Sequence, residues 1–198
     1  MPISDCEVRD PRIRRTRRLL QEALKTLMQT KSFEEISVQD ITEVATVNRA
    51  TFYDHYTDKY SLLEAMVGGG FHGMLHERNV AFDGTCSEAL RALVLAACDY
   101  VSQAHSGGDC ERQSAFQPLI DAAMTAAVQR VLMQGMPSGA PVGLPNEVIA
   151  AAASWAIVGA VNQWFAAPGR PAAEEVVTPV LALILPMLEQ AGALKNPQ

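Results

Sequence analysis

ISVQDITEVATVNRATFYDHYTDK, residues 36–59, is the stretch of sequence that decides the fold. Within it, Ser37 is followed three residues later by Asp40, which is the spacing of a capping box. In a capping box each side chain accepts a hydrogen bond from a backbone N–H of the other residue, and a helix begins there. We therefore expect a short helix over residues 38–45.

A tight turn and a second short helix follow in the same stretch. Residues 46–48 can form the turn, and the side chain of Asn48 can cap a helix over residues 49–55. Two short helices joined in this way can hold one helix across a DNA backbone and place the next helix in the major groove. The spacing therefore indicates a helix-turn-helix.

The helix over residues 49–55 divides its side chains between two faces. Phe52 and the following Tyr56 lie four residues apart and share one face. We expect this face to pack against Ile41, Val44 and Leu62. Hydrogen-bonding side chains occupy the remaining surface: Arg49, Thr51, Tyr53 and His55. The same spacing also fits aromatic residues packed in an ordinary helical bundle.

A longer helix is expected before this motif, over residues 12–30. Its apolar residues recur at helical spacing and leave most of its arginines on the remaining surface. These apolar residues are Ile13, Leu20, Leu24, Leu27 and Met28. Six arginines crowd into residues 9–18: Arg9, Arg12, Arg14, Arg15, Arg17 and Arg18. Such a cluster is either a solvated helix face or a surface that meets nucleic acid.

The composition is that of an ordinary globular protein. The chain has 198 residues, of which 48% are hydrophobic and 19% charged, so a disordered or collagen-like chain is excluded. Helical spacing dominates throughout, and the fold class is expected to be all-α. The net charge of −6 does not exclude a nucleic-acid partner, because residues 1–60 hold ten basic and ten acidic groups and the surplus negative charge lies downstream.

Several classes of function find no motif in this sequence. It contains no glycine-rich phosphate loop, nucleophile elbow, HExxH or paired CxxC motif, so we do not expect an enzyme. The four scattered cysteines argue against a zinc site or a disulfide framework, and no cofactor is expected. The N-terminus lacks a secretory signal, and the longest apolar run, residues 148–161, is too short to span a bilayer. A cytoplasmic protein without a membrane partner is therefore expected.

Residues 12–63 resemble the DNA-binding domain of the TetR family of transcriptional regulators (TetR/AcrR type). The resemblance rests on ISVQDI, residues 36–41, and on VNRATFYDHYTDK, residues 47–59, and it covers about a quarter of the chain. One departure is Thr46, because the family commonly has glycine in this turn. The resemblance implies a helix-turn-helix repressor that a small-molecule effector releases from a pseudo-palindromic operator.

The same resemblance implies roles for individual residues. Four are expected to bind phosphates: Ser37, Tyr53, His55 and Lys59. Four are expected to read bases, since arginine can fork onto guanine, glutamine onto adenine, and a methyl group can contact thymine: Gln39, Arg49, Ala50 and Thr51. Arg12 and Arg14, with the rest of the arginine cluster, are expected to lie near the DNA backbone or in the flanking minor groove.

A long helix is expected to begin near Lys59 and to bend or break locally at Gly68-Gly69-Gly70, since each glycine costs roughly 1 kcal/mol in a helix interior. This helix is the natural lever between the DNA-binding head and the rest of the chain. The triple glycine is either its hinge or a site of close packing against a neighbouring helix. Four further helices are expected, over residues 86–105, 112–133, 146–166 and 173–191.

The last two expected helices are rich in apolar and small residues, and the resemblance places them in a four-helix interface of a homodimer. The residues expected at this interface are Ile157, Val161, Trp164, Leu181, Leu185 and Leu188. Burial of these residues within one copy of the chain is the alternative.

An effector pocket is expected from composition alone, because such pockets are mostly apolar. Its expected lining is Met66, Met74, Cys98, Tyr100, Phe116 and Trp155, although residues of these types also serve as plain core. His72 and His76 share a helix face and are able to bind a metal together with His105 or a cysteine. No further ligand follows at a fixed spacing, so we assign no metal site.

Two domains are expected: residues 1–58, with the N-terminal arm and the helix-turn-helix, and residues 59–198, which bind the effector and dimerise. The expected partners are double-stranded operator DNA, a second copy of the chain and an unidentified small molecule. Two other functions fit the same features. One is a constitutive DNA-binding protein without an effector. The other is a helical protein-interaction module whose basic cluster is incidental.

Overall fold

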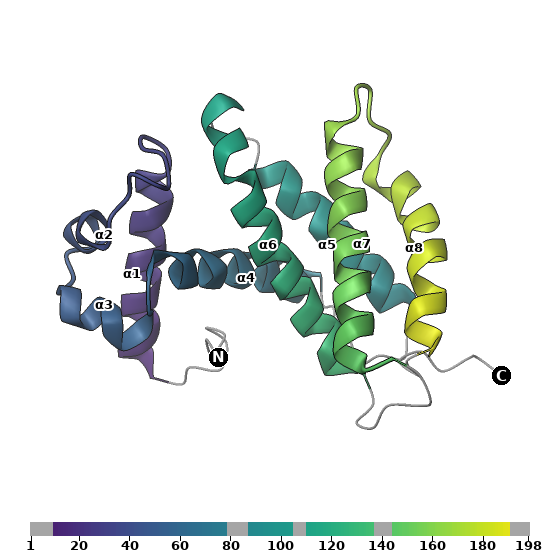
Figure 1. The fold of residues 1–198 in the computed structure, drawn as a ribbon, viewed down its shortest axis with the longest axis horizontal. Coiled ribbons are helices and arrows are strands. Elements are labelled where there is room, and N and C mark those ends of the chain that lie inside the picture. Colours follow the sequence, from purple (N-terminus) through teal and green to yellow (C-terminus); the bar gives the residue numbers. More distant parts are fainter. Residues whose placement is uncertain (1–9, 79–86, 105–109, 137–143, 191–198) are drawn as a thin grey trace. The chain divides into compact units, whose positions relative to one another are not determined.

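The computed structural model describes residues 10–78, 87–104, 110–136 and 144–190, and for residues 110–116 and 190 it describes the backbone alone. All regular structure in these ranges is helical, which confirms the all-α prediction (Figure 1). The helices are α1 (Pro11–Leu27), α2 (Val38–Ala45), α3 (Arg49–His55), α4 (Lys59–Glu77), α5 (Ser87–Ala104), α6 (Cys110–Gly135), α7 (Asn146–Ala166) and α8 (Ala173–Gln190).

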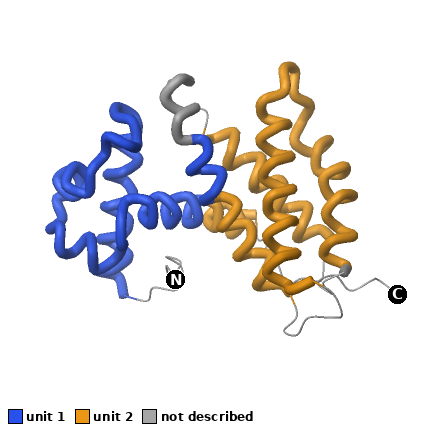
Figure 2. Tube along the Cα trace, in the orientation of Figure 1, with its two compact units in different colours: residues 1–70, 108–123 blue, residues 71–107, 124–198 orange. Residues whose placement is uncertain are grey.

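The chain divides into two compact units (Figure 2). The first unit holds residues 1–70 and 108–123, and the second holds residues 71–107 and 124–198. Helix α4 therefore gives its first part to one unit and its last part to the other. The expected boundary at residue 58 separates a DNA-binding domain from an effector-binding domain, whereas these units are defined by compactness alone. That boundary stays a prediction.

The first unit has its core between α1, α2, α3 and the start of α4. The apolar face of α1 is buried there, together with the segment between α1 and α2 and one face of α3. The largest side chains with almost no exposed surface are Leu20, Leu24, Phe33, Ile36, Ile41, Phe52 and Leu62. Burying a side chain of this size contributes about 1.5–3 kcal/mol to folding, so this cluster holds the small helices α2 and α3 in place.

The second unit is built on α5, α7 and α8, which pack against one another in pairs. Their shared core contains Leu93, Val94, Ile157, Val158, Val161, Val177, Ile184 and Leu188. Of the described helices, α7 alone has the length and apolar composition of a membrane span, and core helices of soluble proteins have the same properties. Because one face of α7 is covered by α5 and α8, it is a core helix here.

The glycine run in α4 does not break the helix. Helix α4 continues without interruption from Lys59 to Glu77, so the expected local break at Gly68-Gly69-Gly70 is wrong. Apolar side chains are buried on both sides of the run, including Leu63, Val67 and Phe71. Packing of this kind supplies most of the stability of helices in proteins, and here it outweighs the low helix propensity of glycine.

Candidate nucleic-acid interface

The start of α2 is held by the expected capping box. The hydroxyl of Ser37 accepts a hydrogen bond from the backbone N–H of Asp40 at 3.1 Å, and the carboxylate of Asp40 accepts one from the N–H of Ser37 at 2.8 Å. The ammonium of Lys31 also donates to Asp40, at 2.7 Å. The bond from Lys31, then one from the Ser37 hydroxyl and that from the Ser37 N–H, hold the pKa of the Asp40 carboxylate well below its usual range, and the bond to Asp40 raises the pKa of Lys31.

The turn of the motif passes through Thr46. This residue has φ 55° and ψ 43°, and it is the one described non-glycine residue with positive φ. The N–H of Val47 donates to the carbonyl of Thr42 at 3.0 Å, which is the bond that closes a helix end of this type. The departure from glycine noted in the sequence therefore falls on the residue whose conformation favours glycine most.

Helix α3 begins where the sequence predicts, because the side chain of Asn48 accepts a hydrogen bond from the N–H of Ala50 at 2.8 Å. Phe52 and Tyr56 are buried, and their rings lie 5.9 Å apart. Of their expected neighbours, Ile41 and Leu62 are buried as well. Val44 is 48% exposed, so its expected place in this core is wrong: it lies on the outer face of a helix of only two turns.

The opposite face of α3 is open to solvent. Arg49, Ala50 and Tyr53 are exposed, and Thr51 and His55 are half-buried beside them. On α2, Ser37 and Gln39 are exposed too. The residues expected to contact DNA on α2 and α3 are thus on accessible surface.

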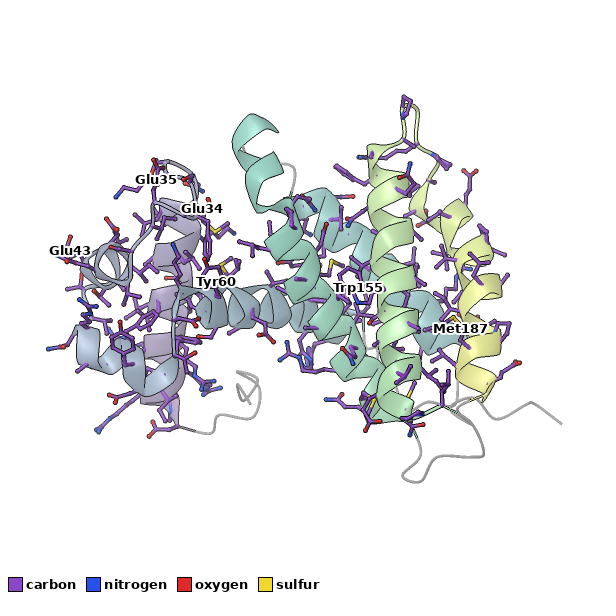
Figure 3. The ribbon with its side chains drawn as sticks, in the orientation of Figure 1. Glu34, Glu35, Glu43, Tyr60, Trp155 and Met187 are labelled. Carbon is purple, nitrogen blue, oxygen red and sulfur yellow. The ribbon has the colours of Figure 1, made fainter. Side chains whose placement is uncertain are left out.

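Two of the expected base readers already have partners within their own helices. The guanidinium of Arg49 lies over the ring of Tyr53, 5.8 Å from its centroid, and donates to the Tyr53 hydroxyl at 3.4 Å. The amide of Gln39 donates to the carboxylate of Glu43 at 2.9 Å (Glu43 is labelled in Figure 3). Both contacts join residues four apart, so the side chains of Arg49 and Gln39 are each held by a residue on the next turn of the same helix.

The arginine cluster of α1 separates into two groups. Arg12, Arg14, Arg15 and Arg18 are exposed, whereas Arg17 is buried and its guanidinium lies 5.9 Å from the centroid of the Tyr56 ring. Arg17 therefore belongs to the core of the head and does not join the others on a DNA-facing surface. Its spacing carries that signal, because Arg17 falls between Ile13 and Leu20 on the apolar face of α1.

Lys59 has contacts that the sequence does not predict. Its ammonium donates to the carbonyl oxygens of Phe33 at 2.7 Å, Glu34 at 3.0 Å and Ile36 at 2.8 Å. It also lies 4.9 Å from the centroid of the Phe33 ring and 5.8 Å from that of Tyr60. All three donors of this ammonium are thus bonded within the protein, and the expected bond to a DNA phosphate stays a prediction.

The expected effector-pocket residues do not share one environment. Met66 and Met74 on α4 are half-buried, as is Tyr100, and Cys98 is buried. Trp155 is 60% exposed on α7, so it does not share the buried surroundings of Cys98 (Figure 3), and its expected place in an apolar pocket stays a prediction. The side chain of Phe116 lies outside the described residues.

Burial also governs the chemistry of the polar groups on α5. It raises the pKa of the Cys98 thiol to about 12, with a smaller contribution from the nearby Asp99, and it raises the pKa of Tyr100 to about 12. The Phe71 ring packs edge-on against Tyr100, with 6.4 Å between the ring centroids. Both groups therefore stay protonated even in mildly alkaline solution, and Cys98 behaves as a core residue.

Most of the residues expected at a dimer interface are buried within one copy of the chain, which was the alternative expectation. Ile157, Val161 and Leu188 have no exposed surface, because α5, α7 and α8 cover them within one copy. Trp164 is buried as well, and its indole N–H donates to the carbonyl of Pro171 at 2.9 Å. Leu181 and Leu185 are half-buried.

The large apolar side chains exposed on these helices are different ones. Val148 and Trp155 on α7 and Leu183 on α8, which is 70% exposed, are accessible in the monomer. In sequence all three fit the same apolar pattern as their buried neighbours. Only the packing of α5, α7 and α8 against one another distinguishes the buried faces from the exposed ones.

His72 and His76, the two histidines that share a face of α4, have no further metal-binding side chains gathered around them within the described residues. His72 and His76 are exposed on α4, and within the described ranges no group of three or more metal-binding side chains comes together. His105, Cys6, Cys86 and Cys110 lie outside the residues whose side chains are described. Cys98 is a free thiol.

Comparison with known proteins points to one family. Residues 19–66 match the family described as bacterial regulatory proteins, tetR family. An uncharacterized HTH-type transcriptional regulator of Bacillus subtilis (strain 168), YxbF, is 44% identical over 59 residues, which are 29% of this chain and 16% of that protein. The HTH-type dhaKLM operon transcriptional activator DhaS of Lactococcus lactis subsp. lactis (strain IL1403) is 30% identical over 64 residues, 32% of this chain and 34% of that protein.

These two matches span about a sixth and about a third of the relatives' own lengths. Among solved structures, a TetR-family regulator from Streptomyces coelicolor A3 matches with a TM-score of 0.61 at 16% identity, over 92% of this chain and 99% of that one. At this identity the likeness shows the fold, and it extends beyond the helix-turn-helix into the later helices.

Proposed function

We propose, from the match of residues 19–66 to the tetR family of bacterial regulatory proteins, that this protein is a sequence-specific DNA-binding repressor released by a small molecule. The observation that carries the proposal is the exposed face of α3. Its inner face is anchored by the buried Phe52 and Tyr56, while Arg49, Ala50 and Tyr53 face solvent. A capped, anchored helix with one polar face free is what entry into a major groove requires.

In the proposed complex α2 crosses the DNA backbone and α3 enters the groove. The phosphate contacts come from Ser37, Tyr53 and His55, which fix register and affinity. The base contacts come from Gln39, Arg49, Ala50 and Thr51, which supply sequence preference. The exposed Arg12 and Arg14 add a salt-dependent attraction to the flanking backbone.

The proposed protein acts as a homodimer in the cytoplasm, with an interface on the exposed faces of α7 and α8. Trp155 and Leu183 are the largest exposed apolar side chains of the two helices. On α7 the exposed positions beside Trp155 are Ala152 and Gly159, and a Cβ built on Gly159 meets nothing within 4 Å. A wide apolar face with small residues permits the close approach of a second helix pair.

Release by an effector follows from linkage. A ligand that binds best when the two heads are wrongly spaced for the operator must weaken DNA binding, and DNA must weaken the binding of that ligand by the same factor. Helix α4 is the proposed carrier of this coupling. Just beyond its end, Arg78 forms an ion pair with Asp99 of α5, which fixes the end of the lever to the second unit.

Selection of bound sequences from random double-stranded DNA tests the proposed function. The expected result is a pseudo-palindrome whose half-sites are centred about one helical turn, roughly 34–36 Å, apart. Recovery of a single asymmetric site contradicts the dimeric arrangement. Recovery of no enriched sequence contradicts sequence-specific binding and favours an architectural or protein-binding function.

A further inference from the structure

The ammonium of Lys59 sits in a cup of three carbonyl oxygens. These belong to Phe33, Glu34 and Ile36, all in the segment between α1 and α2, at 2.7, 3.0 and 2.8 Å. A lysine ammonium has three N–H donors, so each of them has an acceptor within the protein. The rings of Phe33 and Tyr60 border the cup, and their faces attract the same charge. Glu34 and Tyr60 are labelled in Figure 3.

The segment that accepts these bonds, residues 33–36, ends just before Ser37, the first residue of the capping box. Ile36 directly precedes Ser37, which caps α2 and is expected to contact a phosphate. A second lysine, Lys31, holds the same helix start through Asp40 at 2.7 Å. The segment that leads into α2 is thus tied through Lys59 to the first turn of α4.

The start of α4 is also a poor place for a phosphate. The carboxylate of Asp58 accepts a hydrogen bond from the N–H of Ser61 at 2.7 Å, and Asp58 in turn donates its N–H to the Ser61 hydroxyl at 3.2 Å. The N–H of Ser61 at this helix end is therefore already bonded, and the carboxylate of Asp58 beside it carries a negative charge. A phosphate at Lys59 would have to displace three carbonyl acceptors and approach this carboxylate.

We propose that Lys59 is a positioning residue, which clasps residues 33–36 to the start of α4 and so holds α2 and the start of α4 in a fixed arrangement within the first unit. The inference rests on the proposed DNA-binding function. It replaces the phosphate contact expected from the sequence with a role that acts through Ser37 and α2. A compact ammonium is required, since the planar guanidinium of arginine presents its donors as a fork.

The first test needs no DNA. We expect nitrogen-15 lysine spectra of the full-length protein to show a slowly exchanging ammonium signal that disappears in Lys59→Met. We also expect Lys59→Met and Lys59→Arg to lower the melting temperature. Lys25→Met is the matched control, because it removes an exposed lysine of α1 and leaves the cup intact. A Lys59 ammonium that exchanges as fast as Lys25, or variants that melt like the wild type, overturns the clasp.

The second test measures affinity against salt concentration for two duplexes, a mixed-sequence pool and the sequence that the wild type selects from random DNA. We expect Lys59→Met to weaken binding to the selected duplex by about tenfold and to the pool by less than about twofold, because non-specific binding depends on charge and not on register. The slope of log affinity against log salt stays at the wild-type value.

A phosphate contact at Lys59 gives a different pattern. The slope then becomes shallower by about 0.9 for the lost contact, both duplexes lose affinity equally, and Lys59→Arg restores binding. This outcome overturns the proposal. A wild type that binds neither duplex contradicts the proposed function instead, and the DNA-free measurements still decide the clasp.

Discussion

At residue scale, the clearest tension in the molecule lies at Thr46. Its left-handed backbone conformation costs an L-residue roughly 1–2 kcal/mol, and a β-branched side chain adds crowding. The side chain is exposed, so nothing in the core offsets that cost. The helix-turn-helix nevertheless closes at this residue, because the caps on both sides and the buried aromatic residues of α3 determine the path of the chain.

Thr46→Gly is therefore expected to raise the free energy of unfolding by about 1 kcal/mol, the strain relieved less the added flexibility of the unfolded chain. Urea unfolding of the two proteins measures the difference. Thr57→Gly is the matched control, since Thr57 is exposed and does not have positive φ, and it is expected to lower stability slightly. An equal effect of both changes argues against strain at Thr46.

Arg49→Ala tests base reading by the exposed residue at the start of α3. The expected result is a loss of about 1–3 kcal/mol in binding to the selected sequence, with relaxed preference at one base pair in each half-site. Binding to a panel of singly substituted duplexes measures both. A uniform loss on every duplex identifies Arg49 as a phosphate contact.

At the scale of elements, α2 depends on a charged cap rather than on its length. Eight residues are too few for a stable helix in isolation, so the bonds among Lys31, Ser37 and Asp40 matter. The ionised carboxylate of Asp40 accepts the bonds from the Lys31 ammonium and from the N–H of Ser37. Its contribution to stability is complete above the ordinary pKa of 3.8 and disappears as the pH falls through the lowered value.

Asp40→Asn is expected to remove this part of the acid dependence. The wild type loses stability as the pH falls below about 4 partly because Asp40 takes up a proton on unfolding, and the asparagine variant has no such proton to gain. Urea midpoints measured from neutral pH down into acid test this. If the urea midpoints of the two proteins fall equally in acid, the lowered pKa of Asp40 is contradicted.

The lever helix α4 is expected to become more stable when its glycines are replaced. Gly73 is exposed and a Cβ built on it meets nothing within 4 Å, so Gly73→Ala should raise the free energy of unfolding by about 0.5–1 kcal/mol.

If the run Gly68-Gly69-Gly70 is a hinge, Gly69→Ala reduces the loss of DNA affinity that an inducing ligand causes, and Gly73→Ala does not. Equal ligand responses in the two variants favour close packing as the purpose of the run.

At the scale of the whole molecule, the proposed dimer depends on the exposed faces of α7 and α8. Trp155→Glu and Leu183→Glu place a charge on that face and are expected to give monomers in sedimentation experiments. Val44→Glu is the control, because it changes an exposed apolar residue of the other unit, and it should leave the dimer intact. Folded dimers in all three variants place the interface elsewhere.

The sequence by itself determined the local features of this protein. The helix starts at Val38 and Arg49 follow from caps that join residues two or three apart, and Thr46 is marked as unusual by its place in the turn. The all-α fold follows from the spacing of apolar residues. Interactions of this kind involve near neighbours, so the order of residues is enough to reveal them.

Only the tertiary structure decided which of several equivalent residues are buried. Lys59 meets carbonyls more than twenty residues away, and Arg17 meets the ring of Tyr56 on another helix. The apolar pattern of α7 is the same for Ile157, which is buried, and for Trp155, which is not. Burial depends on which helix packs against which face, and that is settled by contacts between distant parts of the chain rather than by the pattern within any one of them.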